Sequence, residues 1–303
     1  MKDYLSYLNE YYPIRRSKED KEKFIEYIKE EVIDYNVSVE TIKNEHNNIV
    51  IGDVENAKVI FTAHYDTPAA SIIPNLMLPK NKVLSHLYAF GMPIILALIC
   101  LFISYVFTSL LKLPDVVFAS IYVVLYLGSY YLLTRFFTNK NNYNDNTSGV
   151  ATILSLIEMN KSGKIAFILF DNEEKGLLGS KAYNKEHIEL MKNKLVINLD
   201  CVGNGNNFIV IVKDKAKNCF EFTKLEESII SNGIYSVEFI DFKKACGNSD
   251  HKNFEMGIGI VACKKNKRGL CYTDKIHTKK DIEVSSENIY FLSEKLSEFI
   301  KLI

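Results

Sequence analysis

The sequence predicts an α/β domain with a mainly parallel sheet, into which a pair of membrane-spanning helices is inserted. Along the 303 residues, short apolar runs typical of strands alternate with amphipathic patterns typical of helices. This alternation places helices between parallel strands. The middle of the chain instead contains two long apolar runs that are almost free of ionisable residues. Apolar residues make up 48% of the chain, which suffices for a sizeable core.

The segment before the long apolar runs predicts one helix and three strands. Residues 17–35 show helical periodicity, with Ser17 and Asp20 in the positions of a capping box. Three short strand-like runs follow, at residues 37–43, 47–52 and 57–66. The last of them ends in "AHYD", so we expect His64 and Asp66 at the end of a buried strand.

Two runs in the middle of the chain are long enough to cross a bilayer, which takes about 20 apolar residues of helix. Residues 84–111 contain one ionisable residue, His86, and residues 116–134 contain none. The alternative, two buried helices of a soluble core, is disfavoured because such helices normally carry a polar stripe. Residues 112–115 are too few to cross back, so we expect a tight hairpin whose outer ends emerge on one side of the membrane.

The charges around this hairpin predict its orientation. The lysine at its tip is offset by an aspartate, whereas four basic residues flank its outer ends: Lys80, Lys82, Arg135 and Lys140. Because positive flanks tend to stay in the cytoplasm, we expect an integral membrane protein with a cytoplasmic domain and a hairpin in contact with membrane lipid. The spans contain no acidic residue, which disfavours a transport path.

The hairpin is interpreted as an insert in one domain. We expect residues 1–82 and 138–303 to form the α/β domain and residues 83–137 to form the hairpin. After the hairpin, helices are predicted at residues 148–160, 179–194, 217–232 and 285–303. Strands are predicted at residues 163–171, 195–203, 207–213 and 257–263.

The bulk composition excludes some classes of partner. The formal net charge is +0, which leaves no basic field for a phosphate backbone, so we expect no nucleic-acid partner. Six cysteines occur without a CxxC pair, which indicates reduced and mostly buried thiols. Nothing in the sequence indicates an oligomeric state.

Side chains suited to metal binding gather where the predicted strands end, which is where ligands bind in an open α/β sheet. They are His64, Asp66, Glu173, Glu174 and Asp200, together with Asp145 at the start of a helix and His277 in an irregular segment. Each motif alone has an ordinary explanation, such as a strand-end pair, an acidic first turn or a helix cap. Together, two histidines and three carboxylates match the nitrogen and oxygen ligands of a dinuclear zinc-type site.

The order of the motifs resembles a known family. The series "AHYDT", "NDNTSGVA", "DNEEKGLLGS", "NLDCVG", "NSDHKNF" and "IHTKKD" is similar to that of the dinuclear zinc exopeptidases of metallopeptidase family M28. This family includes bacterial leucyl aminopeptidases, glutamate carboxypeptidases and glutaminyl cyclases. The resemblance covers nearly all of the chain outside the hairpin. It implies a three-layer sandwich around a mixed, mainly parallel sheet, and two zinc ions per chain.

The resemblance implies which residues of this chain would bind the two metal ions. Asp145 would bridge the two zinc ions. Glu174 and His277 would complete one site, and His64 and Asp200 would complete the other. All five residues are present in the sequence.

The resemblance also implies two catalytic residues beside the ligands. Glu173 would be the general base, and Asp66 would accept a hydrogen bond from the far nitrogen of His64 and fix its tautomer. The segment Ser249–His251 matches a family element, but we assign it no chemical role. The hairpin departs from the family, because it replaces a connection that is ordinarily a short loop.

On this resemblance we expect a metallopeptidase that acts on peptides, most simply an aminopeptidase. A carboxypeptidase would need a cation, ideally an arginine, for the substrate's terminal carboxylate, and Arg268 is the only arginine after the hairpin. A single-metal glutaminyl cyclase stays open, although His64 and Asp200 argue for a second metal. A non-catalytic membrane scaffold of the same fold is disfavoured because the ligands and the base are all present.

Overall fold

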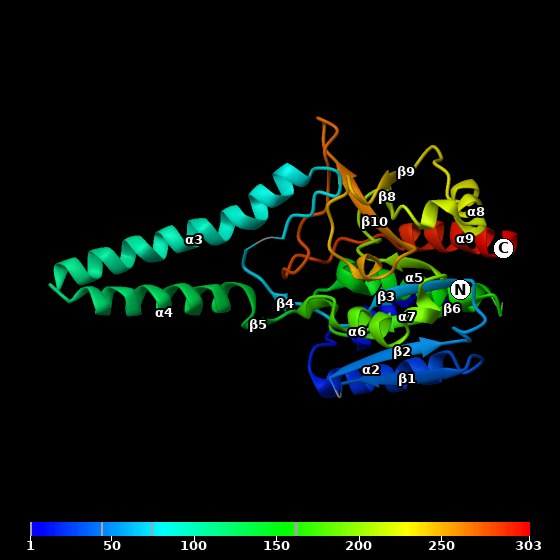
Figure 1. The fold of residues 1–303 in the computed structure, drawn as a ribbon, viewed down its shortest axis with the longest axis horizontal. Coiled ribbons are helices and arrows are strands. Elements are labelled where there is room, and N and C mark those ends of the chain that lie inside the picture. The colour runs from blue at the N-terminus through cyan, green and yellow to red at the C-terminus, as the bar shows by residue number, and fades with distance from the viewer. Residues whose placement is uncertain (1, 44, 74, 161–162) are drawn as a thin grey trace.

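A mixed sheet lies at the centre of the computed structural model, which describes residues 2–43, 45–73, 75–160 and 163–303 (Figure 1). Among these residues the sheet has nine strands in the order β1-β2-β6-β3-β7-β10-β8-β9, with β11 paired to β10. The four central strands β6, β3, β7 and β10 are parallel, and antiparallel pairs join them to the strands on either side. The strands are β1 (Val37–Ile42), β2 (His46–Ile51), β3 (Val59–His64), β6 (Ile165–Phe170), β7 (Leu195–Leu199), β8 (Asn207–Val212), β9 (Ser236–Asp241), β10 (Gly257–Lys265) and β11 (Cys271–Tyr272).

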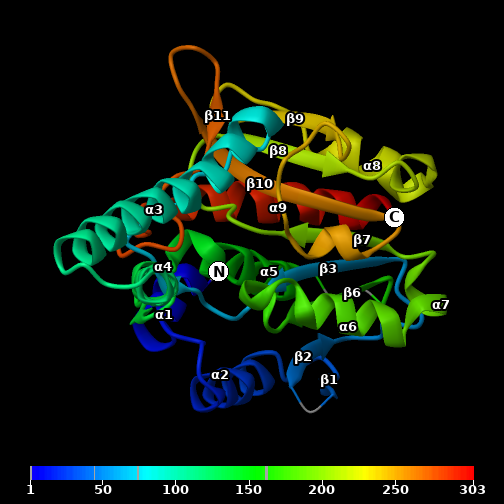
Figure 2. The ribbon, with the colours of Figure 1, turned by 60° about the vertical axis from the view of Figure 1, so that its left-hand side comes forward.

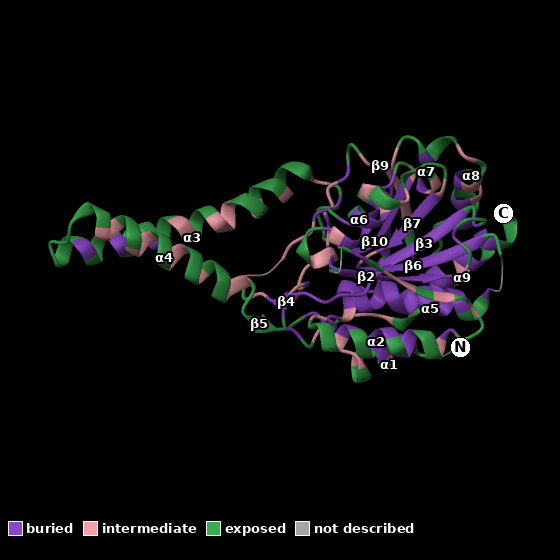
Figure 3. Ribbon diagram, turned by 60° about the horizontal axis from the view of Figure 1, so that its bottom comes forward, coloured by how far each residue is buried: buried purple, intermediate pink, exposed green. Residues whose placement is uncertain are grey.

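Helices cover both faces of the sheet and give three layers, as predicted (Figures 2 and 3). One face is covered by α1 (Tyr4–Tyr11), α2 (Lys18–Glu31), α5 (Ser148–Met159), α8 (Phe220–Ser228) and α9 (Ser286–Leu302), and the other by α6 (Leu178–Glu186) and α7 (Ile188–Met191). Strand β3 shows how the layers are held. Val59, Phe61 and Ala63 pack into the first core, whereas Ile60 packs into the second, because successive side chains point to opposite faces.

Apart from strands of two residues, the main differences from the sequence prediction concern helix α1, the helix predicted at residues 179–194 and strand β9. Helix α1 was not predicted; it is short, is capped by the Asp3 side chain, which accepts from the Ser6 N–H at 3.1 Å, and buries Leu5 and Leu8. The helix predicted at residues 179–194 is broken at His187 into α6 and α7. Strand β9 was also not predicted, since its residues are only partly buried at the edge of the sheet.

The capping box predicted for α2 is present and starts the helix where the sequence indicated. The Ser17 hydroxyl accepts from the Asp20 N–H at 3.1 Å, and the Asp20 carboxylate accepts from the Ser17 N–H at 3.0 Å. On the buried face of this helix, Lys21 reaches across to the segment that follows β6. Its ammonium group lies 2.5 Å from the Asp171 carboxylate and donates to the Asn172 side-chain oxygen at 2.8 Å.

The two long apolar runs form helices α3 (Lys82–Leu110) and α4 (Asp115–Thr134), which project from the domain as a hairpin (Figure 1). They pack against each other along small side chains, and Cys100, Ser104 and Thr108 are buried at successive turns of α3. Only 11% of the most apolar window of α3 and 0% of that of α4 is buried. A core helix of a soluble protein would be mostly buried. Both helices are long and apolar enough to cross a membrane.

A short neck joins the hairpin to the domain. Strand β4 (Ala69–Ala70) pairs with β5 (Phe137–Thr138), so the chain leaves and returns at one place. Beyond this pair, the Ile72 N–H donates to the Leu133 oxygen at 2.7 Å. The neck therefore fixes the base of α4 against the segment that follows β3.

A fully buried arginine connects the N-terminal segment to the sheet. The Arg15 guanidinium donates to the backbone oxygens of Tyr65 and Tyr12, at 2.5 Å and 2.6 Å, and to the Thr147 hydroxyl at 3.1 Å. Burial lowers the pKa of Arg15 to about 10, so the group stays charged at neutral pH. It joins the end of β3 to the start of α5.

We expect Arg15→Ala to lower the free energy of unfolding by roughly 3 kcal/mol or more, because it leaves buried acceptors without a donor at about 1–3 kcal/mol each. Arg16→Ala is the control, since Arg16 makes one exposed hydrogen bond, to the Arg135 oxygen, and should cost under about 1 kcal/mol. Denaturant unfolding of the full chain in detergent measures both. Equal losses for the two variants would contradict the role given to Arg15.

Candidate metal centre

The predicted site residues meet at the carboxyl edge of the parallel strands. His64 is the last residue of β3, and Asp200 directly follows β7. Glu173 and Glu174 lie in the turn η2 (Glu173–Lys175) after β6. Asp145 comes from the turn η1 (Tyr143–Thr147) that leads into α5, and His277 comes from the loop after β11.

The Asp145 carboxylate lies between the two histidines. Its Oδ1 is 3.2 Å from the Nε2 of His64, which is in turn 3.8 Å from the Asp200 carboxylate. Its Oδ2 is 2.9 Å from the Nε2 of His277, which is 3.3 Å from the Glu174 carboxylate. The five residues thus form two groups of three that share Asp145, and in each group the possible ligand atoms lie within 4.8 Å of one another.

The chemistry of these groups fits a metal ion. The donors are imidazole nitrogens and carboxylate oxygens, the set that zinc prefers together with thiolates. Within the described part of the chain, neither the Nε2 of His64 nor the Oε1 of Glu174 has a hydrogen-bond partner, although both atoms are buried. Buried polar atoms without a partner are costly, and a bound cation would satisfy both.

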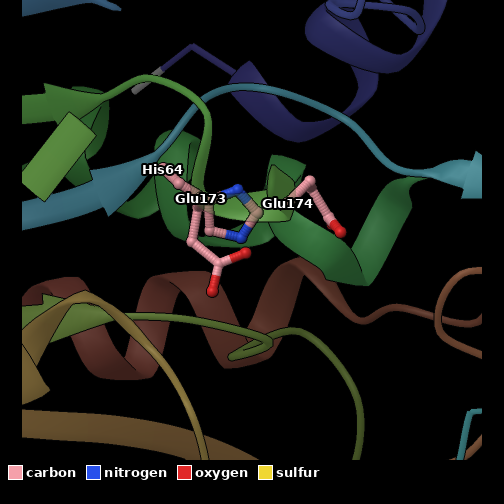
Figure 4. A group of neighbouring side chains, drawn as sticks. All are labelled: His64, Glu173 and Glu174. Carbon is pink, nitrogen blue, oxygen red and sulfur yellow. The ribbon is translucent and has the colours of Figure 1, made fainter. Parts of the chain in front are cut away.

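Glu173 lies beside the two groups but belongs to neither of them. With His64 and Glu174 it forms a third set of close ligand atoms. Figure 4 shows the Glu173 and Glu174 carboxylates diverging from the turn that carries them, on either side of the His64 ring. The two carboxylates therefore point in different directions from adjacent positions, and only that of Glu174 belongs to a group that contains Asp145.

The pKa values in the site reflect burial and close neighbours. Burial raises the pKa of Glu173 well above its ordinary value and also raises that of Glu174. Burial favours the neutral form of His64 and His277 and would lower their pKa values. The nearby carboxylates have a larger effect and raise both pKa values; the main one is Glu173 for His64 and Glu174 for His277. Burial would also raise the pKa of Asp145, but the two histidines lower it. Protons thus balance charge here, and metal binding would displace them.

Asp66 lies beside His64, as expected, and it has a further role. The Nδ1 of His64 lies 3.1 Å from the Asp66 backbone oxygen and 3.6 Å from its carboxylate, so the backbone oxygen is the closer acceptor. The carboxylate instead accepts from the backbone N–H groups of Glu173, at 3.0 Å, and Glu174, at 3.2 Å. Asp66 therefore positions the turn that carries both glutamates.

Asp281 holds the Asp145 segment in the same way, and the sequence analysis missed it. Its carboxylate accepts from the backbone N–H groups of Asn144, at 3.3 Å, and Asp145, at 3.0 Å. Burial raises the pKa of Asp281 to about 7. Its only sequence signal is its place at the end of "IHTKKD", four residues after His277.

Two further residues support the glutamate turn. Lys21 fixes Asp171 and Asn172, which precede the turn, and its signal in the sequence is a lysine at helical spacing from Phe24 and Ile25 on an apolar face. Arg135, at the end of α4, donates to the Glu174 backbone oxygen at 3.3 Å. The hairpin therefore contacts a segment that carries a predicted ligand.

The segment Ser249–His251 lies at the same edge of the sheet but outside both ligand groups. The Ser180 hydroxyl donates to the Asp250 carboxylate, and burial raises the pKa of Asp250 to about 7. His251 is buried, and this lowers its pKa to about 4. A Cβ at position 259 would lie 2.6 Å from the His251 ring, so Gly259 provides the space for it.

The site opens into a cavity of about 760 Å³. One wall contains predicted site residues, namely Asp145, Glu173, Glu174, Asp200 and His277. Its volume is within the usual range of ligand pockets, about 300–1,000 Å³. The centre is therefore accessible to a ligand larger than water.

Comparisons with known proteins identify the family. A model of peptidase family M28 matches residues 137–288, about half of the chain. The chain belongs to peptidase family M28. No curated protein sequence matches it.

Solved structures with similar folds include an aminopeptidase, a glutaminyl cyclase and a Zn-dependent exopeptidase, all at low sequence identity. The LapA aminopeptidase of Legionella pneumophila is 15% identical with a TM-score of 0.56, over 98% of this chain and 68% of that chain. A glutaminyl cyclase of Porphyromonas gingivalis is 14% identical with a TM-score of 0.59, over 99% and 96%. A Zn-dependent exopeptidase of Parabacteroides distasonis is 16% identical with a TM-score of 0.56, over 98% and 95%. These likenesses confirm the predicted fold.

For this M28 member we expect Asp66→Asn to weaken zinc binding by about 10- to 100-fold, the usual effect of losing a residue that orients metal ligands. An amide side chain has one acceptor oxygen, so one of the N–H groups of Glu173 and Glu174 would lose its partner. Competition with a zinc chelator measures the affinity. Asp53→Asn is the matched control, because Asp53 also accepts a backbone N–H, from Asn56 at 3.1 Å, but on an exposed turn. Unchanged affinity for Asp66→Asn would refute the positioning role.

Proposed function

We propose that the protein is a membrane-anchored, zinc-dependent aminopeptidase that removes N-terminal residues from peptides. The observation that carries this proposal is the pair of ligand groups that share Asp145, with Glu173 beside them. In the proposed arrangement, His64 and Asp200 would hold one zinc ion, Glu174 and His277 would hold the other, and Asp145 would contribute to both sites. Membership of peptidase family M28 supports peptides as the substrates.

The chemistry follows from what each residue can do in this place. When bound, the metal ions would lower the pKa of a shared water and stabilise the oxyanion of the tetrahedral intermediate. Glu173 accepts a proton from that water as the oxygen attacks the peptide carbonyl carbon. It then donates the proton to the leaving nitrogen as the C–N bond breaks.

A carboxypeptidase is the second candidate, and one observation favours it. The structure brings Arg135, Lys175 and Lys252 to the wall of the cavity. Arg268, the only arginine after the hairpin, is not among the residues that line the cavity, whereas Arg135 at the end of the hairpin is. A panel of aminoacyl and carboxyl-terminal reporter peptides distinguishes the two activities. An N-terminal glutaminyl peptide in the same panel tests the cyclase, which would release ammonia without hydrolysing the chain.

We also propose that residues 83–137 anchor the domain, formed by residues 1–82 and 138–303, to the cytoplasmic face of the cell membrane. The exposure of nearly all of the apolar surface of α3 and α4 supports this proposal, because water would be a poor environment for it. The basic residues at the base of the hairpin support the orientation.

The anchor predicts that the protein stays with the membrane fraction in high salt and in alkaline carbonate and is released only by detergent. A chain in which residues 83–136 are replaced by a short polar linker serves as the control and should leave the membrane. Protease added to the outside of intact cells should leave the α/β domain uncut, whereas protease added to inverted vesicles should cleave it. Release of the full chain by carbonate would rule out the anchor.

The adjacent glutamates give the sharpest test of the proposed site. We expect Glu173→Gln to keep its zinc but lose about 10²- to 10⁴-fold in kcat, because the amide cannot accept the proton. Glu174→Gln should instead bind zinc more weakly, with activity partly restored by excess zinc, because a neutral amide replaces an anionic ligand.

The two variants are controls for each other, since the same atoms change at neighbouring positions. Bound zinc per chain and turnover of an aminoacyl reporter are measured for both. Loss of zinc in Glu173→Gln and its retention in Glu174→Gln would mean that the two roles are reversed. Full turnover in both variants would overturn the proposed active site.

A further inference from the structure

The wall of the cavity opposite the metal centre is made by the base of the hairpin. Tyr88, Met92 and Leu96 from α3 line it, and Tyr130 and Thr134 from α4 line it as well. One continuous space therefore joins the proposed catalytic residues to helices that we assign to the membrane. Figures 1 and 3 show that α3 and α4 lie together at the tip of the hairpin and separate towards the domain.

The two helices differ in length, so only α3 continues beyond the other helix at the end nearest the domain. Helix α3 has 29 residues and α4 has 20, and they run antiparallel from a common tip. At a rise of 1.5 Å per residue, α4 is about 30 Å long, which matches the hydrocarbon core of a bilayer. The additional residues of α3 are those nearest the domain, from Lys82 to about Phe90. They extend past the end of α4, and Tyr88 and Ala89 among them line the cavity.

The cavity is lined by charged groups at the metal centre and by apolar and polar groups at the hairpin. Helix α3 contributes an apolar strip of Ala89, Met92, Pro93 and Leu96, next to the polar side chains of Ser85, His86, Tyr88, Tyr130 and Thr134. A ligand that fills this space needs a polar end group and a body that can contact the apolar strip. A free N-terminus followed by apolar side chains has this character, and a short polar peptide does not.

Hydrogen bonds hold the apolar wall in place beside the site. The Ser71 N–H donates to the backbone oxygen of His277 at 2.6 Å, and the next N–H, of Ile72, donates to Leu133 in α4 at 2.7 Å. At the base of α3, the Lys80 ammonium lies 2.6 Å from the Glu238 carboxylate of β9. The wall is thus part of the folded site and not a loosely attached arm.

We propose that the substrates are apolar peptides associated with the bilayer, and that the end to be cleaved enters the metal centre between the bases of α3 and α4. This inference rests on the proposed function, to which it adds the substrate class and the residues that select it. Met92 and Leu96 contact the apolar part of the peptide while its N-terminus reaches the metal centre.

The test uses the full chain in phospholipid vesicles and two reporter peptides that share their first residues. One continues in a leucine-rich tail and the other in a serine-rich tail of equal length. The readout is the ratio of kcat/KM for the apolar peptide to kcat/KM for the polar one. A double variant, Met92→Ala with Leu96→Ala, shortens the cavity wall. The control, Ile94→Ala with Leu98→Ala, truncates two apolar side chains of similar size at the same spacing, but on the exposed face of α3 and outside the cavity.

We expect the wild-type protein to prefer the apolar peptide, and the cavity variant to lose about tenfold of that preference, because apolar contact area is removed from the bound peptide. The control variant should keep the wild-type ratio, which corrects for the higher local concentration of any apolar peptide in the bilayer. A ratio that is near one in the wild type, unchanged in the cavity variant, or lowered equally in the control would overturn this inference while leaving peptidase activity established. If the protein hydrolyses neither of the two peptides and no carboxyl-terminal reporter, the proposed function and this inference are both overturned.

Discussion

The buried carboxylate of Asp145, placed between the rings of His64 and His277, is the interaction on which the site depends. Carboxylates crowd this edge of the sheet, and burial alone would neutralise them by raising their pKa values. The fold keeps them in place through backbone groups. Asp66 accepts two successive N–H groups from the turn of Glu173 and Glu174, and Asp281 accepts two from the turn of Asp145. Two buried aspartates thus position, in the same way, the two turns that carry predicted ligands, so the side chains of Asp145, Glu173 and Glu174 are not needed to hold the backbone.

The position of the hairpin follows from this geometry. The chain enters the hairpin after β3, which ends at His64, and returns before the turn that carries Asp145. An insert at this place would separate two halves of the site if it were attached loosely. The pairing of β4 with β5 closes the neck, so the halves stay together however far the hairpin extends. The backbone bond from Ser71 to His277 and the bond from Arg135 to Glu174 then tie the neck to segments on both sides of the predicted site.

The sequence was sufficient for those parts of the structure that depend on local pattern or motif order. Buried parallel strands read as continuous apolar runs, and the Ser17 and Asp20 capping box is a local signal, so both were predicted. The predicted ligands could be placed because strand ends meet at one edge of the sheet. Contacts between distant segments could not be placed in this way. Lys21 in α2 binds Asp171, which follows β6 and is far from Lys21 in the sequence. Arg135 contacts Glu174 only because the hairpin brings the chain back to the domain. The resemblance implied a contact of the Asp66 carboxylate with His64, but it gave no sign that the same carboxylate accepts two backbone N–H groups from the glutamate turn.

On the proposed topology, the length of α4 fixes the distance between the metal centre and the bilayer. A helix of about 30 Å spans the hydrocarbon core from end to end, so Arg135 directly after it lies at the level of the lipid headgroups. A guanidinium is stable at this level, since its stem contacts apolar surface while its charge stays in a polar layer. Arg135 nevertheless donates to the backbone of Glu174 at 3.3 Å. Arg135 therefore links the proposed active site to the membrane surface, because its side chain is stable in the headgroup layer and also binds the backbone of the glutamate turn. On this topology, the cavity opens where the ends of membrane-associated peptides would emerge.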